Sequence, residues 1–167
     1  MKKLDARLQA IADLVHGDII ADIGSDHAYL PAWLVKNNRI KKAYAIDISA
    51  KCVARIKTNL ARFNIPQEII TPVLSNGLSE LNAADLTGLT DIIIAGMGGE
   101  TIAGIIDNIT IENSANINFI LQPNSKKDFL KEYLLTNNFK VLQEMRVQDK
   151  KRYYIIIAAE VNCVRYV

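Results

Sequence analysis

Residues 19–26 read IIADIGSD, an apolar run that ends in an acid and a glycine turn. The run has the length and the isoleucine content of a short buried strand. Gly24 allows the chain to turn sharply after that strand, and helical spacing of apolar residues begins near His27 and lasts to about Asn37. This order of strand, turn and helix is the repeating unit of parallel sheets.

The same unit recurs along the chain. A helix is predicted before the first strand at residues 4–15, and further helices begin at Ser49, after Gly99 and at Ser125, where Ser125 and Asp128 have capping-box spacing. The further strands are predicted at residues 43–46, 69–74, 91–95, 118–121, 140–147 and 153–159. The last two strands read as a hairpin. We therefore expect an α/β fold with a doubly wound, mostly parallel sheet and an antiparallel C-terminal hairpin strand at one edge.

Length and composition set the broad class. The 167 residues fit one domain, in which residues 1–160 carry the predicted elements and residues 161–167 form a tail of unknown role. Half of the residues are apolar and 23% are charged, as in soluble globular proteins. The two cysteines lie far apart, and no apolar run has the length that spans a bilayer. We expect a cytoplasmic monomer that binds neither a metal nor a membrane.

Charge is unevenly distributed along the chain. No lysine or arginine lies between Arg62 and Lys126, and this stretch holds seven acidic residues. The rest of the chain carries a net charge of +9, concentrated in residues 36–62 and 126–152. Such a field steers polyanions towards part of the surface, although the same charges also fit solvated helix faces, such as the outer face predicted to carry Arg55.

In a doubly wound sheet, ligands bind beyond the carboxyl ends of the strands, so the residues there are the candidate site. Asp22 and Asp26 flank the first turn, which lacks the second glycine of a pyrophosphate-binding loop and suits a ligand with an ammonium group. Asp47 ends the second strand, where a carboxylate accepts hydrogen bonds from ribose hydroxyls. Asn76 follows the third strand, where its amide suits an adenine edge. A ribosyl ligand with a charged amino acid end and no phosphate is S-adenosylmethionine.

Two further motifs follow the central strands. Residues 96–99 (GMGG) leave room for a ligand beside the backbone, and residues 122–124 (QPN) form a polar, rigid segment. His27 and Tyr29 lie beside the first turn, where an imidazole can exchange a proton and a phenol ring can stack on a base. Each of these candidates also has a structural alternative, namely a helix cap, a tight turn or core packing.

Three of these motifs together resemble the bacterial tRNA (adenine-N1)-methyltransferases that modify position 22. They are residues 21–31 (ADIGSDHAYLP), 94–99 (IAGMGG) and 120–124 (ILQPN), and residues 4–8 (LDARL) resemble the start of that family. The similarity covers residues 4–160, in the family's order. It implies a Rossmann-like class I methyltransferase fold, S-adenosylmethionine as the methyl donor and tRNA as the substrate.

The resemblance also implies roles for individual residues. The cofactor-binding set that it implies is Asp22, Gly24, Ser25, Asp26, Asp47, Ile48, Asn76, Gly77, Ala95 and Gly96. The set implied at the target base and the tRNA is Arg7, Met97, Gly98, Gly99, Gln122, Pro123 and Asn124. The chain departs from the family in two respects. Relatives commonly carry an acid where Asn76 stands, and the family's C-terminal coiled-coil extension, which helps to grip tRNA, is absent from this sequence.

The chemistry of the base determines which residues we expect to be catalytic. Adenine N1 carries a lone pair at neutral pH, so the protein must mainly hold it in line with the donor methyl group. The methylated base is cationic, so we expect Asp26 to stabilise that charge or His27 to take up a proton, with Tyr29 beside the base. The alternatives are a methyltransferase for another substrate, a nicotinamide-dependent enzyme, which the missing second glycine disfavours, and a non-catalytic RNA-binding domain with the same fold.

Overall fold

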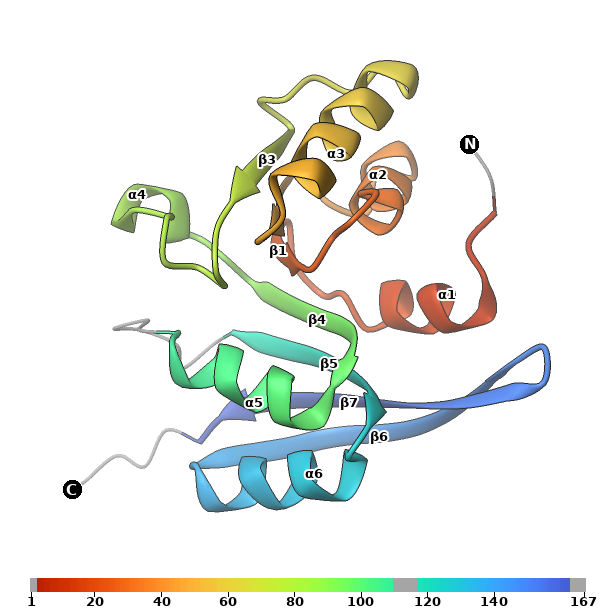
Figure 1. Cartoon of the computed structure of the whole chain (residues 1–167), viewed down its shortest axis with the longest axis vertical. Coiled ribbons are helices and arrows are strands. Elements are labelled where there is room, and N and C mark those ends of the chain that lie inside the picture. The colour runs from red at the N-terminus through yellow and green to blue at the C-terminus, as the bar shows by residue number, and fades with distance from the viewer. Residues whose placement is uncertain (1–2, 110–116, 163–167) are drawn as a thin grey trace.

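The computed structural model describes residues 3–109 and 117–162, and the strands in these ranges form one sheet with helices on both sides (Figure 1). The strands are β1 (Ile19–Ile23), β2 (Lys42–Asp47), β3 (Ile70–Leu74), β4 (Asp91–Gly98), β5 (Asn118–Ser125), β6 (Phe139–Asp149) and β7 (Arg152–Val161). The helices are α1 (Ala6–Asp13), α2 (Tyr29–Lys36), α3 (Ala50–Arg62), α4 (Ala83–Leu86), α5 (Gly99–Asp107) and α6 (Lys127–Thr136). Of the predicted tail, residues 163–167 lie outside the described residues.

The sheet has the strand order β3-β2-β1-β4-β5-β7-β6. Strand β7 runs antiparallel to both of its neighbours, β5 and β6, and the other pairs are parallel. The chain order reverses between β1 and β4, which makes the carboxyl ends of these two strands the topological switch point. The predicted doubly wound, mostly parallel sheet is confirmed. The antiparallel strand is β7, and β6 lies outside it at the edge.

Each face of the sheet is covered by its own apolar core. Helices α1, α2 and α3 pack over the face that contains Ile20, Ile93 and Ile120, and α5 and α6 pack over the opposite face. These three isoleucine side chains are fully buried, and burying each contributes roughly 1.5–3 kcal/mol relative to exposure. Because both faces are covered, the inner strands are continuous apolar runs rather than alternating ones.

Strands β4 and β5 extend further than the sequence predicted. They remain paired as far as Gly98 and Ser125, with register shifts on either side of Met97, so residues 96–98 belong to an irregular strand end rather than a turn. The prediction that Ser125 caps α6 is wrong, because the β4 pairing holds Ser125 in β5. The residue before α6 is Lys126, in a left-handed conformation and without a side-chain cap. By contrast, Ser49 caps α3 as predicted. The short helix α4 was not predicted.

Strand β6 contains a bulge that changes which face its side chains occupy. Val141 pairs with Ala159, but the next pair is Gln143 with Ala158, so β6 has one extra residue at this point. Before the bulge, Val141 packs on the α5–α6 side, whereas Met145 beyond it packs on the opposite side with the α1–α3 core. The even-numbered residues 144–148 therefore face the α5–α6 side.

The amino end of β4 carries a buried carboxylate with a structural task. Asp91 is fully buried and accepts hydrogen bonds from the backbone N–H groups of His16 and Gly17, at 3.2 and 3.0 Å, and from the amide of Asn118 at 2.8 Å. It thereby ties the segment before β1 to β4 and β5. The candidate acids Asp22, Asp26 and Asp47 lie at the opposite end of the strands, where β1 and β2 finish.

Candidate functional site

The turn after β1 is fastened to the neighbouring strand β2. The backbone N–H groups of Gly24 and Ser25 donate to the carbonyl oxygen of Ile46, at 2.8 and 2.9 Å. Gly24 has a φ of +77°, and Asp26 and Ala28 also adopt left-handed conformations, with φ of 48° and 54°. Non-glycine residues in this conformation carry local strain, which is concentrated at functional sites. The turn therefore presents its backbone and its acids at the switch point.

Asp22 is a buried carboxylate at the end of β1. Only 7% of it is exposed, and Ser25 Oγ donates to its Oδ2 at 2.6 Å. Burial raises the pKa of this carboxyl from 3.8 to about 6, against the lowering effects of the Ser25 hydrogen bond and the Arg7 charge, while Asp47 raises it slightly further. A carboxylate whose pKa is raised by burial gains from a cationic ligand that replaces the lost solvation. Asp22 is thus suited to an ammonium group.

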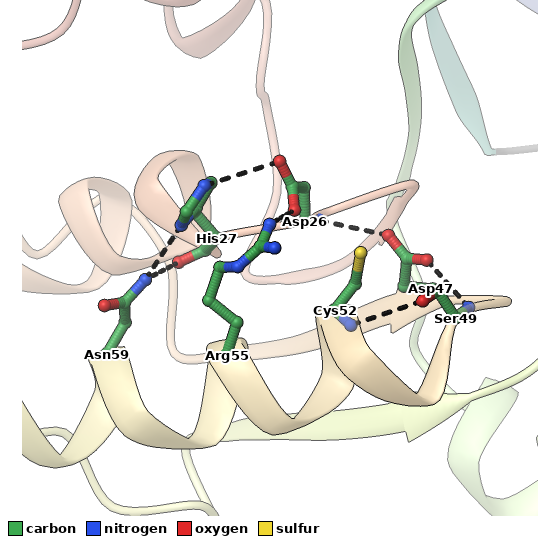
Figure 2. A network of polar contacts seen from close by, with 7 residues as sticks. All are labelled: Asp26, His27, Asp47, Ser49, Cys52, Arg55 and Asn59. Atoms are coloured by element: carbon green, nitrogen blue, oxygen red, sulfur yellow. Dashed lines mark hydrogen bonds and ion pairs between the residues drawn. The ribbon is translucent and has the colours of Figure 1, made fainter.

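Asp47 occupies the corresponding position at the end of β2. Its Oδ1 accepts the N–H of Ser49 at 2.9 Å and its Oδ2 accepts the N–H of Asp26 at 3.3 Å (Figure 2). These two hydrogen bonds fix the carboxylate and leave a lone pair on each oxygen for further donors. The loop after β3 adjoins it, because the N–H of Ser75 donates to the Asp47 carbonyl oxygen at 3.1 Å. The exposed side chain of Asn76 follows directly.

A polar network connects the first turn to α3 (Figure 2). Arg55 donates to Asp26, and His27 Nε2 lies 3.5 Å from the other oxygen of that carboxylate. The amide of Asn59 lies 3.3 Å from His27 Nδ1 and donates to the His27 carbonyl oxygen at 3.1 Å. Two adjacent residues predicted to be catalytic, Asp26 and His27, are therefore held in place by side chains of α3.

Arg55 and Asn59 are site residues that the sequence reading missed. Arg55 was expected on a solvated outer face of its helix, which is wrong, because its side chain is only 35% exposed and is paired with Asp26. The two residues are four positions apart, so they lie on one side of α3, facing the first turn. This spacing was the one available signal, and it is equally common in helices without such a partner.

Tyr29 extends the site away from the strand ends. Its ring stacks on His27, with centroids 5.0 Å apart and planes inclined by 9°, and its centroid lies 6.1 Å from that of the tilted Phe63 ring. Tyr29 is 46% exposed and lines a groove of about 960 Å³ together with Arg62, Phe63 and Lys150. The three rings form an aromatic path from the first turn into this groove.

The ends of β4 and β5 border the turn on its other side. A Cβ added to Gly24 would lie 2.1 Å from Met97 Cε, so Met97 lies against the glycine turn. The buried Gln122 accepts from Arg7 at 2.8 Å and donates to Asn124 at 3.0 Å, and Asn124 donates to the carbonyl oxygen of Gly96 at 2.8 Å. This chain of hydrogen bonds links α1, β5 and β4, so Arg7 belongs to the same edge as the strand-end motifs.

Most of the residues predicted for the site thus meet at the β1–β4 switch point. Ile48 is 72% exposed just beyond Asp47, and Pro123 is buried between its polar neighbours. Gly99 packs tightly against the start of α6, where a Cβ would lie 2.3 Å from the Lys126 carbonyl oxygen, so this glycine also has a packing role. Within residues 3–109 and 117–162, no helix has the length and apolarity to cross a membrane, and no three acidic, histidine or cysteine side chains are grouped as a metal site.

Comparison with known proteins agrees with this geometry. Residues 4–157 match the methyltransferase domain family. The chain is 30% identical to the tRNA (adenine(22)-N(1))-methyltransferase of Bacillus subtilis, over 95% of this chain and 65% of that protein. The crystal structure of the B. subtilis m1A22 tRNA methyltransferase TrmK has a TM-score of 0.87 at 30% identity, over 96% of this chain and 67% of that chain. M. capricolum TrmK, in complex with S-adenosyl-homocysteine, gives 0.84 at 34% identity, over 96% and 70%.

The fold and the carboxylates at the ends of β1 and β2 define a Rossmann-like methyltransferase domain. The chain spans 65% of the length of the B. subtilis protein. It belongs to the tRNA (adenine(22)-N1)-methyltransferase family.

Proposed function

We propose that this chain transfers a methyl group from S-adenosylmethionine to N1 of adenine 22 in tRNA. The observation that carries the proposal is the pair of carboxylates at the switch point, with Asp22 at the end of β1 before the fastened glycine turn and Asp47 at the end of the adjacent strand β2. This pair matches a ligand with an ammonium group and a ribose, and an acid at each end of the turn opposes a pyrophosphate. The B. subtilis relative is named for this reaction, and the M. capricolum structure contains S-adenosyl-homocysteine.

The residues present fit this methyl donor. Asp22 would hold the ammonium group, with Ser25 fixing the carboxylate. Asp47 has one lone pair left on each oxygen, and a ribose offers two neighbouring hydroxyls. Gly24 keeps the turn free of a Cβ, which would lie 2.1 Å from Met97 Cε, and the remaining positions proposed for the cofactor are Asp26, Ile48, Asn76, Gly77, Ala95 and Gly96.

The chain's own contribution to catalysis is positioning and charge. S-adenosylmethionine supplies an electrophilic methyl group, and the nucleophile is a neutral lone pair, so no proton has to be removed before the transfer. Holding N1 in line with that methyl group is worth roughly 7–11 kcal/mol. We assign the holding of the base to Tyr29 by stacking and to the hydrogen-bonded edge of Gln122 and Asn124, with Arg7 and residues 97–99 beside it.

Positive charge moves from the donor to the base during the transfer, and the site holds acids nearby. Asp26, which Arg55 and His27 hold in place, would contribute its negative charge beside the cationic product. His27 would take up the proton that the base releases. Residues 1–160 would form the catalytic domain, acting in the cytoplasm as a monomer.

The proposal is tested by calorimetry of S-adenosylhomocysteine binding, with NAD as the comparison ligand. We expect wild type to bind S-adenosylhomocysteine and not NAD, and Asp47→Ala to lose at least about tenfold in affinity, because the loss of one charge-assisted hydrogen bond is worth about 1.5–3 kcal/mol. Methyl transfer to a tRNA transcript, compared with a transcript that carries guanine at position 22, then tests the substrate. Binding of NAD instead, or equal methylation of both transcripts, would refute the assignment.

A further inference from the structure

Strands β5 and β7 separate on the side of the sheet where the candidate site lies. They pair only over residues 118–121 of β5 and 157–160 of β7. Beyond Leu121, β5 stays with β4, whereas residues 152–156 of β7 continue beside β6 into a projecting hairpin (Figure 1). The separation opens a crevice between Pro123–Asn124 and the hairpin, with two adjoining hollows of about 310 and 350 Å³.

The walls of this crevice are cationic and aromatic. Lys127 and Arg146 line one hollow and Arg152 lines the other, Tyr153 lines both, and no acidic side chain lines either. The Arg146 guanidinium lies over the Tyr153 ring, 3.9 Å from its centroid, and the tyrosine is 56% exposed. Among the residues that the structure describes, none of the three cations forms an ion pair with a carboxylate. Their charge is thus available to an anionic partner.

The crevice is continuous with the edge proposed to border the target base. Pro123 and Asn124 line both hollows, and Asn124 also donates to the Gly96 carbonyl oxygen at the end of β4. An anionic polymer with one monomer bound at the switch point would therefore place the neighbouring monomers in this crevice.

We propose that the crevice between β5 and the β6–β7 hairpin binds the ribose-phosphate backbone of RNA beside the base that is methylated. This inference rests on the proposed function and extends it to the cations of α6 and the hairpin, which have no role assigned above. Guanidinium groups match phosphate oxygens in a two-pronged geometry, and an Arg-stacked tyrosine offers its exposed side to a base or ribose. RNA is favoured over an acidic peptide because a peptide carries the charge but not the flat bases that such a ring accepts.

The test is the binding of an unmodified tRNA transcript to a variant that combines Lys127→Gln, Arg146→Gln and Arg152→Gln. All three side chains are exposed, so the fold should persist. Each phosphate contact contributes about −0.7 to the dependence of log affinity on log salt for a single strand. Removal of three contacts should reduce that slope by about 2 and lower the affinity about 100-fold at 0.1 M salt.

The matched control removes the same charge from the other end of the strands, at the amino-terminal ends of β1, β2 and β6, with Lys36→Gln, Lys41→Gln and Lys140→Gln combined. All three lysines are exposed there. We expect this control to bind tRNA within about threefold of wild type, and both variants to keep wild-type affinity for S-adenosylhomocysteine, because neither change touches the carboxylate pair.

Three results would overturn the inference. They are a crevice variant that binds tRNA as wild type does, a control that loses as much affinity, and an equal loss of affinity for an oligoglutamate peptide, which would show a general anion surface. Failure of wild type to methylate tRNA would instead refute the proposed function, and the comparison of binding affinities would still judge the crevice on its own.

Discussion

Burial of the Asp22 carboxylate lowers the free energy of unfolding at neutral pH, but the same buried charge favours the binding of a cationic ligand. Burial raises its pKa from 3.8 to about 6. Between these two pH values the folded state binds more protons than the unfolded state, so the free energy of unfolding falls as the pH rises. At about 1.4 kcal/mol for each pH unit, the loss amounts to about 3 kcal/mol and is complete above pH 6.

Replacement of this carboxyl by an amide should remove that loss. We expect Asp22→Asn to exceed wild type in unfolding free energy by about 2–3 kcal/mol at pH 7.5, and to equal it near pH 4, because the amide keeps the shape without a charge to desolvate. Urea unfolding followed by circular dichroism at pH 4, 5, 6 and 7.5 measures the difference. Asp18→Asn, which changes a carboxylate that is 54% exposed, serves as the control and should stay within about 0.5 kcal/mol.

The same variant should lose affinity for S-adenosylhomocysteine at pH 7.5 by at least about tenfold, since an amide gives up the charge-assisted hydrogen bond to the ammonium group. Stability and binding should thus change in opposite directions. An Asp22→Asn protein that is less stable than wild type at pH 7.5, or whose advantage does not vary with pH, would refute the desolvation argument.

Four further changes and one control have defined outcomes. Gly24→Ala puts a Cβ 2.1 Å from a methionine methyl group at a φ of +77°. It should therefore lower the unfolding free energy by more than the roughly 1–2 kcal/mol that a left-handed alanine costs. Gly104→Ala has open space around the new Cβ and should raise the unfolding free energy by up to about 1 kcal/mol, and urea unfolding measures both changes. Asp91→Ala leaves buried donors unpaired and should cost about 3 kcal/mol or more in the same assay. Arg55→Gln should slow single-turnover methyl transfer about tenfold and retain the affinity for S-adenosylhomocysteine. The control Lys57→Gln, on the exposed side of α3, should keep the wild-type rate. Equal rates for the two variants would show that the pairing of Arg55 with Asp26 is not needed.

The parts of the site that could be predicted from the sequence are those determined by the order of strands, turns and helices along the chain. A buried strand followed by a glycine turn places Asp22 at a strand end, and the next strand places Asp47 beside it, since parallel strands end at one edge. The alternation of strands and helices likewise predicted the sheet, because short continuous apolar runs indicate buried strands and apolar residues at helical spacing indicate the helices between them.

The parts that could not be predicted depend on how distant elements dock. Arg55 reaches Asp26 only because α3 packs over β2 and turns one side towards the first loop. Arg7 reaches Gln122 across 115 positions of sequence. The capping-box pattern at Ser125 failed for the same reason, since pairing between β4 and β5 outweighs a local signal worth about 1 kcal/mol.

Because of the bulge in β6, the number of residues in the strand decides which face of the sheet each side chain of the hairpin occupies. With the extra residue at position 142, Met145 lies on the core side and Arg146 on the side of the crevice. Deletion of Leu142, itself 46% exposed, would restore a simple alternation and exchange the two sides of every residue up to the hairpin tip. A guanidinium would then point into the apolar core and a thioether into the crevice, although no amino acid at either position had changed.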